Sequence, residues 1–312
     1  MIDVSIIMMC YNQESTVARA IESVLNQQTD FSYEIIIGDD HSTDNTRSIC
    51  IEYSKKHHNI IVNDDHPNYG VVKNYAFCLS RCSGEFLMGC SCDDWWHNPQ
   101  KIQTQISYMK SHPQCVLFYS GYRIFYPEVN RYEFIEPAKI KLPQFESVLK
   151  RNPVCALTAC VRMSAMRKID FDSFAKQGFL VEDYPKWMAL SLLGDFYCSD
   201  DVFVTYSSYV GSVQHSNTYL KRIKYVDNDY KMRLYFANQA GKLDELEQML
   251  EDLYFREKAE VAVQYGERKD ARIYFSRIKK KDYKIHLKYL LCCSPISFVF
   301  YCNRYNKKLR FR

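Results

Sequence analysis

The stretch Tyr33–Asp44, which reads YEIIIGDDHSTD, decides the fold class of the first half of the chain. An apolar run of strand length leads into two adjacent carboxylates and then into polar residues that can start a helix. Ser42 and Thr43 are favourable N-cap residues and Asp44 suits a first turn, so we expect a helix from here through Tyr53. A strand, an acidic loop and a helix in succession are typical of α/β proteins.

The same alternation continues on both sides of this stretch. Strands are predicted at residues 4–9, 60–62 and 85–90, and helices at residues 17–25, at residues 71–79 and from Pro99 onward. Strands that alternate with helices form a parallel sheet with helices on both faces. We therefore predict an α/β fold with a Rossmann-like, mainly parallel sheet.

The second half of the chain changes in character. Residues 116–134 are rich in aromatic residues and predict mixed strands that extend the sheet. After them we expect a helix at 145–149, a strand at 154–161, a helix at 183–193, a strand at 202–206, and helices at 243–265 and 268–279. This pattern predicts an α/β domain over residues 1–216 and a helical region over residues 217–312.

Acidic residues follow three of the predicted strands, as Asp39-Asp40, Asp64-Asp65 and Asp93-Asp94. Ligands of open α/β sheets bind beyond the carboxyl ends of the strands, and clustered carboxylates repel one another unless a cation or donors compensate. Asp93 and Asp94 offer the oxygen ligands that Mg²⁺ or Mn²⁺ prefers, and such an ion can bridge diphosphate oxygens. The alternative is an ordinary Asp-rich turn in front of the helix at Pro99.

Two further carboxylates have candidate roles. Asp40 can accept a hydrogen bond from a nucleotide base, such as the N3–H of uracil, while Ser42 caps the helix. Asp183, in the sequence Glu182-Asp183-Tyr184, stands at the start of a predicted helix and could deprotonate a hydroxyl group. An acidic pair is also an ordinary helix N-terminus, so the alternative role is structural.

The charge of the chain is unevenly distributed. The net charge is +4, yet Arg272–Arg312 holds twelve Lys and Arg against Asp282 alone, a local +11 that leaves −7 for the rest. The apolar run Tyr289–Cys302 is shorter than the ~20 residues of a spanning helix, and Pro295 interrupts it. One interpretation is that this tail lies on an anionic membrane surface; the other is a terminal helix that packs on the domain and exposes a solvated basic face. Nucleic acid is not expected as a partner, because no recognition module accompanies the charge.

The thirteen cysteines indicate the compartment. Their number is odd and their spacing irregular, and no secretory signal opens the sequence, so we expect reduced thiols in the cytoplasm. Structural zinc is not expected, because no second pair follows Cys78-x3-Cys82 and Cys90-x-Cys92. If the tail meets a membrane, the expected place is the cytoplasmic face of the inner membrane.

Several sequence blocks stand in a fixed order. They are YN at 11–12, IESVLNQ at 21–27, DDHSTDNT at 39–46, NYG at 68–70, GEF at 84–86, DDWW at 93–96 with Pro99 and Lys101, EDY at 182–184, and Tyr206 with GSV at 211–213. In these blocks the chain resembles the family 2 glycosyltransferases of the GT-A fold. The resemblance implies an inverting, Mg²⁺- or Mn²⁺-dependent enzyme that moves a sugar from a nucleotide diphosphate. A UDP-sugar donor, a glycan or lipid-linked acceptor and a role in cell-surface polysaccharide or lipopolysaccharide synthesis are expected.

The resemblance also implies roles in donor binding. Tyr11 and Glu14 match positions that line the base and ribose pocket, and Asp40 matches the acidic residue that recognises the base. Asn68 and Lys73 match nucleotide contacts. Lys73 stands where Arg is more usual, which keeps the positive charge but loses the bidentate fork.

The metal and the base are carried over in the same way. Asp93 matches the second carboxylate of the family's Asp-x-Asp signature, which binds the metal and contacts the nucleotide, and Asp94 stands beside it. Asp183 matches the catalytic base of inverting members. Ser91 replaces the first carboxylate of the signature, so the resemblance implies that Asp93 and Asp94 are the metal ligands. Cys92 is unusual at its position.

Two other protein classes remain as alternatives. A nucleotidyltransferase would have a Gly-rich basic loop near its N-terminus, which residues 9–12 do not form. A non-catalytic scaffold of the same fold would lose its base or metal residues, and only Ser91 points that way. The loop after residue 206 lacks the basic residues often found there, and His215 is a candidate to replace them.

Overall fold

The computed structural model describes residues 2–140, 144–208 and 218–310, and side chains as far as residue 306. The chain divides into two compact units, Met1–Tyr209 and Val210–Arg312. The predicted boundary between residues 216 and 217 lies outside the described residues. Gly211–Val213 and His215 lie outside the described residues, so their predicted roles are not placed.

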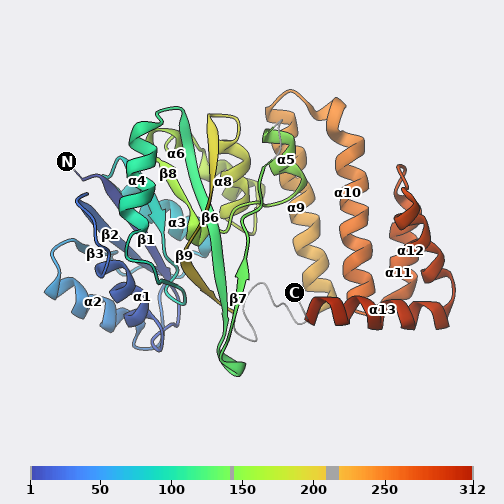
Figure 1. Ribbon diagram of the computed structural model, residues 1–312, viewed down its shortest axis with the longest axis horizontal. Coiled ribbons are helices and arrows are strands. Elements are labelled where there is room, and N and C mark those ends of the chain that lie inside the picture. The colour runs from blue at the N-terminus through green and yellow to red at the C-terminus, as the bar shows by residue number, and fades with distance from the viewer. Residues whose placement is uncertain (1, 141–143, 209–217, 311–312) are drawn as a thin grey trace. The chain divides into compact units, whose positions relative to one another are not determined.

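The N-terminal unit is built on one curled sheet (Figure 1). Its strand order is β3-β2-β1-β4-β8-β6-β9-β5, and β7 pairs with β6. The strands are β1 Val4–Cys10, β2 Tyr33–Asp39, β3 Ile60–Val62, β4 Phe86–Gly89, β5 Trp95–Trp96, β6 Cys115–Tyr126, β7 Arg131–Ile135, β8 Cys160–Arg162 and β9 Asp195–Ser207. The first four pair in parallel, β8 runs antiparallel between β4 and β6, and β6 pairs in parallel with β9. The predicted α/β class is confirmed.

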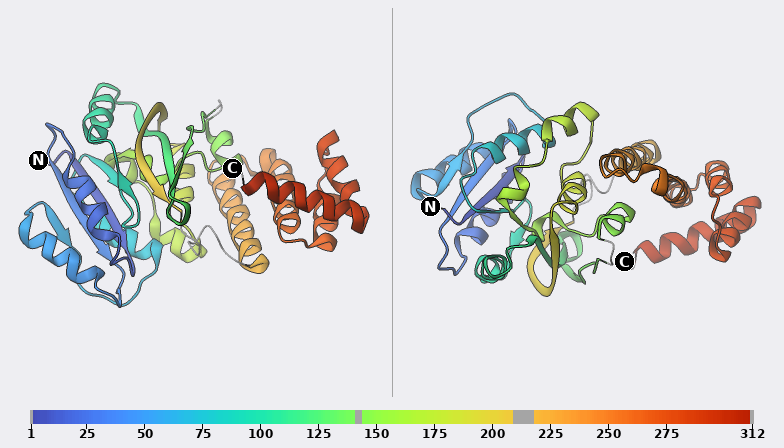
Figure 2. Two further views of the ribbon diagram at one scale, coloured as in Figure 1. Left: turned by 60° about the horizontal axis from the view of Figure 1, so that its bottom comes forward. Right: turned by 90° about the horizontal axis from the view of Figure 1, so that it is seen from above.

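Helices cover both faces of this sheet, as the views in Figure 2 show. They are α1 Val17–Leu25, α2 Thr46–Lys56, α3 Val71–Ser80, α4 Lys101–Ser111, α5 Gln144–Lys150, α6 Met163–Met166, α7 Phe171–Gln177 and α8 Asp183–Leu190, with 3-10 turns η1 Pro127–Val129 and η2 Ala156–Thr158. Alternate residues of β1 serve the two faces: Ile6 and Met8 pack in the core with α1 and α4, and Ile7 lies on the other face. This two-sided burial explains the unbroken apolar run of the strand.

Several predicted boundaries were wrong. The strand expected at 202–206 begins earlier, at Asp195, and the helix expected at 183–193 ends at Leu190. Helix α2 begins at Thr46, because Ser42 does not cap it and Asp44 accepts hydrogen bonds from the Thr46 and Glu14 amides instead. Helix α4 begins at Lys101, two residues after Pro99. The strand expected at 154–161 is η2 followed by the short β8.

The C-terminal unit consists of helices, as predicted. They are α9 Tyr219–Gln239, α10 Leu243–Gln264, α11 Arg268–Arg277, α12 Tyr283–Cys293 and α13 Pro295–Arg310. Its core gathers aromatic and small residues of α10 and α11, among them Phe255, Ala259 and Phe275, with Cys292 and Phe298 from the last two helices. Across the described part of the chain, no helix is both long enough and apolar enough to cross a membrane.

Candidate active site

The loops that follow β1 and β2 are tied together by side-chain to backbone hydrogen bonds. The Asn12 Oδ1 atom accepts from the Thr43 amide at 2.8 Å, and the Asn12 amide donates to Ser42 Oγ at 2.9 Å. Glu14 Oε2 accepts from both the amide and the side chain of Asn45, at 3.0 and 2.8 Å. Asn12 has φ 54°, a left-handed backbone that Asn tolerates better than most residues. Glu14 therefore stabilises the conformation of the two loops at this edge of the sheet. The ring of Tyr11 is half exposed beside it.

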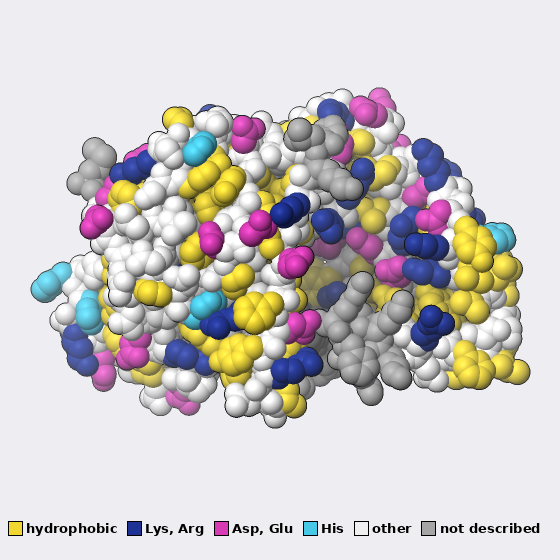
Figure 3. Space-filling model, in the orientation of Figure 1, with side chains coloured by type: hydrophobic (Ala, Val, Ile, Leu, Met, Phe, Trp, Pro, Cys, Tyr) yellow, Lys and Arg dark blue, Asp and Glu magenta, His cyan; other side chains and the backbone are white. Residues whose placement is uncertain are grey.

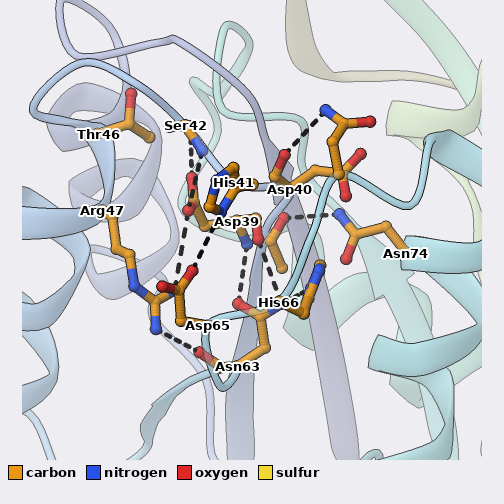
Figure 4. Close-up of polar contacts among 12 residues, drawn as sticks. Asp39, Asp40, His41, Ser42, Thr46, Arg47, Asn63, Asp65, His66 and Asn74 are labelled. Carbon is orange, nitrogen blue, oxygen red and sulfur yellow. Dashed lines mark hydrogen bonds and ion pairs between the residues drawn. The ribbon is translucent and has the colours of Figure 1, made fainter.

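Asp39 is the centre of a buried polar network at the end of β2 (Figure 4). Its carboxylate accepts from the Ser42 hydroxyl and amide and lies 3.8 Å from the Arg47 guanidinium. Its backbone amide donates to Asn63 Oδ1 at 3.0 Å. A buried carboxylate needs such partners, so the role of Asp39 is structural: it links β2, β3 and α2.

Asp40 lies next to it and engages a different segment. Its two carboxylate oxygens accept from the amides of Tyr69 and Gly70, at 2.7 and 2.9 Å, and its carbonyl accepts from Asn68 Nδ2 at 3.0 Å. The fold thus brings together Asp40 and Asn68, two residues expected in one nucleotide pocket. Each carboxylate oxygen keeps a second lone pair, so Asp40 can still accept from a base N–H. Lys73 is exposed on α3, one turn further on.

Asp93 lies after β4, in a loop held by two other elements. Its carbonyl accepts from Arg19 Nη2 at 3.0 Å and from Ser207 Oγ at 2.7 Å. The Arg19 guanidinium also stacks on Trp95, 4.0 Å from the ring centroid. Burial raises the pKa of the Asp93 carboxyl, while the charge of Arg19 opposes that rise. A carboxylate desolvated in this way gains most from a bound cation.

The carboxyl group of Asp94 is turned toward β9. It is 3% exposed, and its Oδ1 atom accepts from the Ser207 amide at 2.7 Å. Burial and the neighbouring charge of Asp93 raise the pKa of Asp94 well above its usual range. In this position Asp94 fixes β9 to the loop of Asp93. One of its two carboxylate oxygens is already used in the bond to Ser207. Cys92 is fully buried in the core, which accounts for an apolar residue there.

A metal ion would have few protein ligands here. Among the residues that the structure describes, no three His, Cys, Asp or Glu side chains gather closely enough to hold a cation. Mg²⁺ and Mn²⁺ bound to nucleotides often use one or two carboxylates, with phosphate oxygens and water completing the shell. The oxygen donor of Asp93 fits that kind of site, whereas Ser91 is exposed and supplies only a hydroxyl.

Asp183 is the first residue of α8. Its Oδ1 accepts from the Tyr184 amide at 2.7 Å, and its Oδ2 accepts from Asn152 Nδ2 at 3.2 Å. Burial raises the pKa of Asp183 to about 6, the negative charge of Glu182 adds to this rise, and the cation of Lys186 opposes it. A carboxyl group with such a pKa is ionised at neutral pH and is a stronger base than an ordinary aspartate.

The neighbours of Asp183 form a buried charge network. Lys186 is 3% exposed, pairs with Glu182 at 3.2 Å and lies 3.8 Å from the centroid of the Tyr75 ring. Burial works against its charge, yet the Glu182, Tyr75 and Asp183 groups together raise the pKa of Lys186. The cation therefore stays charged and influences the base beside it.

One pocket is lined by neighbours of both Asp93 and Asp183, although neither of these two carboxylates lines it. It has a volume of about 60 Å³, and its lining includes Ser91, Tyr75, Glu182, Lys186 and Trp187. Ser91 stands two residues before Asp93, and Glu182 directly precedes Asp183. The loop after β4 and the start of α8, 90 residues apart in the sequence, thus meet on one face of the sheet.

Three residues near this site were not predicted. Arg19 lies in a helix whose sequence shows only an apolar stripe, and Asn152 is an isolated polar residue before η2. Lys186 resembles an ordinary i,i+4 partner of Glu182. Its burial and its ring contact appear only in the fold, so no pattern in the sequence could identify it.

Comparisons with known proteins identify the family of the chain. Residues 5–173 match the sequence model of the family described as Glycosyl transferase family 2. An uncharacterized protein of Mycobacterium tuberculosis, Rv1520, is 35% identical over 127 residues, which are 40% of this chain and 36% of that protein. The glucosyltransferase WfgD of Escherichia coli is 30% identical over 60% of this chain and 69% of its own.

A solved structure shares the fold. The mannosyltransferase PcManGT of Pyrobaculum calidifontis, in complex with GDP-Man and Mn²⁺, superposes with a TM-score of 0.57 at 11% identity, over 97% of this chain and 86% of its own. That similarity concerns the fold alone, and it confirms the expected GT-A architecture. The family match covers more than half of the chain. The chain therefore belongs to glycosyl transferase family 2.

Proposed function

We propose that this glycosyltransferase transfers a sugar, with inversion and with a divalent metal ion, from a UDP-sugar to a hydroxyl of a glycan or lipid-linked acceptor. The observation that carries the proposal is one pocket lined both by Ser91, two residues before Asp93, and by Glu182, directly before Asp183. The name of WfgD describes UDP-Glc as its donor and a diphosphoundecaprenol-linked sugar as its acceptor. This relative supports a role in assembling a cell-surface polysaccharide or lipopolysaccharide.

Asp183 acts as the base in this proposal. The acceptor oxygen forms a bond to the anomeric carbon as the bond from that carbon to the diphosphate oxygen breaks. The acceptor proton passes to the Asp183 carboxylate, which Asn152 and the Tyr184 amide hold in place. A single in-line displacement inverts the anomeric centre, and a positioned base typically contributes about 10²–10⁴-fold to the rate.

In this proposal Asp93 would hold the metal ion. A bound Mg²⁺ or Mn²⁺ would stabilise the negative charge of the departing diphosphate. Arg19 and Ser207 fix the Asp93 backbone, so the loop that carries this carboxylate keeps its position without a second carboxylate at position 91. Asp94 stays a predicted second ligand through its remaining oxygen, because Oδ1 is bonded to Ser207.

The donor base and ribose bind at the edge formed by the loops after β1 and β2. Asp40 accepts the base N–H, and Asn68 lies against it. Tyr11 supplies an exposed aromatic face, and Glu14 holds the loop that carries this ring. Lys73, exposed on α3, supplies a positive charge near the nucleotide.

A donor screen tests the proposal. The purified chain is incubated with UDP-, GDP- and dTDP-sugars and Mn²⁺, and release of the nucleoside diphosphate is followed, with Asp183→Asn as the catalytic control. Turnover restricted to UDP-sugars and dependent on the metal is expected. Calorimetric titration with UDP and Mn²⁺ distinguishes an enzyme from a non-catalytic scaffold of the same fold. Failure to bind any nucleotide diphosphate would favour the scaffold, the alternative that Ser91 suggests.

A further inference from the structure

Helices α12 and α13 each expose an apolar stripe opposite the stripe that they bury. On α12 the buried residues are Ile285 and Cys292, while Tyr283, Leu287 and Leu290 are exposed at 80%, 44% and 51%. At 100° per residue these three side chains lie on the opposite side of the helix from Ile285 and Cys292. A helix that shows apolar groups on both sides has more apolar surface than its own unit can bury.

Helix α13 repeats this arrangement. Phe298 is buried in the core, while Ile296, Val299 and Phe300 are exposed at 73%, 58% and 71%. Solvent-exposed apolar residues are common singly, but a row of three on each of two successive helices marks an interaction surface. We call these six residues the apolar stripe of the tail.

Cations accompany the stripe. Lys280, Lys284 and Arg304 are exposed in the same two helices or directly before them. Lys279 and Lys288 are paired with Glu251 and Glu260 and are partly neutralised. Figure 3 shows hydrophobic and basic side chains side by side over the last helices. From Arg272 onward the only acidic residue is Asp282, which caps α12 through the Ile285 amide.

We propose that the apolar stripe of the tail and its cations bind the surface of an anionic lipid bilayer. Exposed Ile, Val and Phe side chains have no favourable contact with a nucleic-acid backbone, but they enter the boundary between headgroups and acyl chains. A second copy of the chain would bring two surfaces of high positive charge together, which opposes self-association. The lipid surface alone satisfies both the cations and the apolar residues. This binding does not depend on the proposed transfer reaction.

Vesicle flotation of the full chain tests the proposal. Vesicles of phosphatidylcholine with about 30% phosphatidylglycerol are compared with pure phosphatidylcholine. Binding to the anionic vesicles only is expected, weakened at about 1 M salt because the charges are screened. Lys280→Gln with Lys284→Gln should weaken binding at least about tenfold, and Ile296→Glu with Phe300→Glu should abolish it. Leu220→Glu is the matched control, because Leu220 is 77% exposed in the same unit but lies in α9.

A fluorescent reporter guards against misfolded variants. Phe300→Trp places an indole in the stripe, while Trp95, Trp96 and Trp187 all lie in the N-terminal unit. A blue shift of its emission with anionic vesicles, and quenching by brominated acyl chains, are expected. Equal binding by Ile296→Glu/Phe300→Glu and by the unaltered chain would overturn the proposal. So would binding of single-stranded RNA without vesicle binding, or a dimer in light scattering that the Glu variant abolishes.

Discussion

Burial and the charge of Glu182 together set the pH range in which Asp183 can act. Burial and Glu182 raise the pKa of Asp183, and Asp183 works as a base only when ionised, so activity should fall as pH drops through about 6. Replacing Glu182 by Gln removes the negative neighbour but keeps an oxygen that accepts from Lys186. The pKa of Asp183 should then fall by about one unit, the effect expected of a nearby like charge.

The size of the effect follows from the fraction of ionised base. At pH 5 about one-eleventh of Asp183 is ionised with a pKa of about 6, and about half with a pKa of about 5, a gain of about fivefold in rate. At pH 7.5 both proteins are more than about nine-tenths ionised, so their rates should agree. Initial rates of nucleoside diphosphate release between pH 4.5 and 8 measure this directly.

Two controls make the result specific. Asp172→Asn removes an exposed acid from the first turn of α7 and should leave the profile unchanged. Lys186→Met removes the cation that opposes the rise and should move the acid limb to higher pH. An acid limb in Glu182→Gln that stays in place, or moves upward, would refute the assignment of Asp183 as the titrating base.

The remaining predictions concern the metal and donor residues. Asp93→Asn should lose metal-dependent UDP binding in calorimetry, and excess EDTA should stop turnover reversibly, as expected if the metal binds Asp93. Asp94→Asn should stay within about 0.5 kcal/mol of the parent in urea unfolding, whereas Asp94→Ala should lose about 1–3 kcal/mol, because the Ser207 amide is then buried without an acceptor. An Asp94→Asn protein that is stable but no longer binds Mn²⁺ would support Asp94 as the second metal ligand beside Asp93. Asp40→Ala should weaken UDP binding, since the amides of Tyr69 and Gly70 lose their acceptor, with the loss read as a raised Kd.

The sheet could be predicted from the sequence because its central strands are buried on both faces. Such strands show as unbroken apolar runs, and the predicted strand at residues 4–9 is β1 less its last residue. The bounds of the short β8 could not be predicted, because it pairs over only a few residues between β4 and β6. Local signals fail where a side chain has a tertiary role. Ser42 has the chemistry of an N-cap, but its hydroxyl bonds to Asp39.

The places of the candidate site residues in the fold were predictable to a similar extent. The positions of Asp40, Asp93 and Asp183 follow from strand ends and from a helix start, features that a sequence displays. The sequence does not show in which direction a side chain points. Asp93 and Asp94 are therefore equivalent candidates in the sequence, although in the structure the Asp94 carboxylate accepts a hydrogen bond from β9. The charge network of Glu182 and Lys186 around Asp183 depends on burial under Tyr75, which only the folded chain creates.

Replacement of Asp183 by Asn tests the central claim most directly. The Asn side chain keeps the size of Asp and an oxygen for the Tyr184 amide, but it cannot take a proton. We predict that turnover falls by about 10²–10⁴-fold while the Kd for UDP with Mn²⁺ changes by less than about twofold. Unchanged turnover in Asp183→Asn would contradict the account of Asp183 as the base.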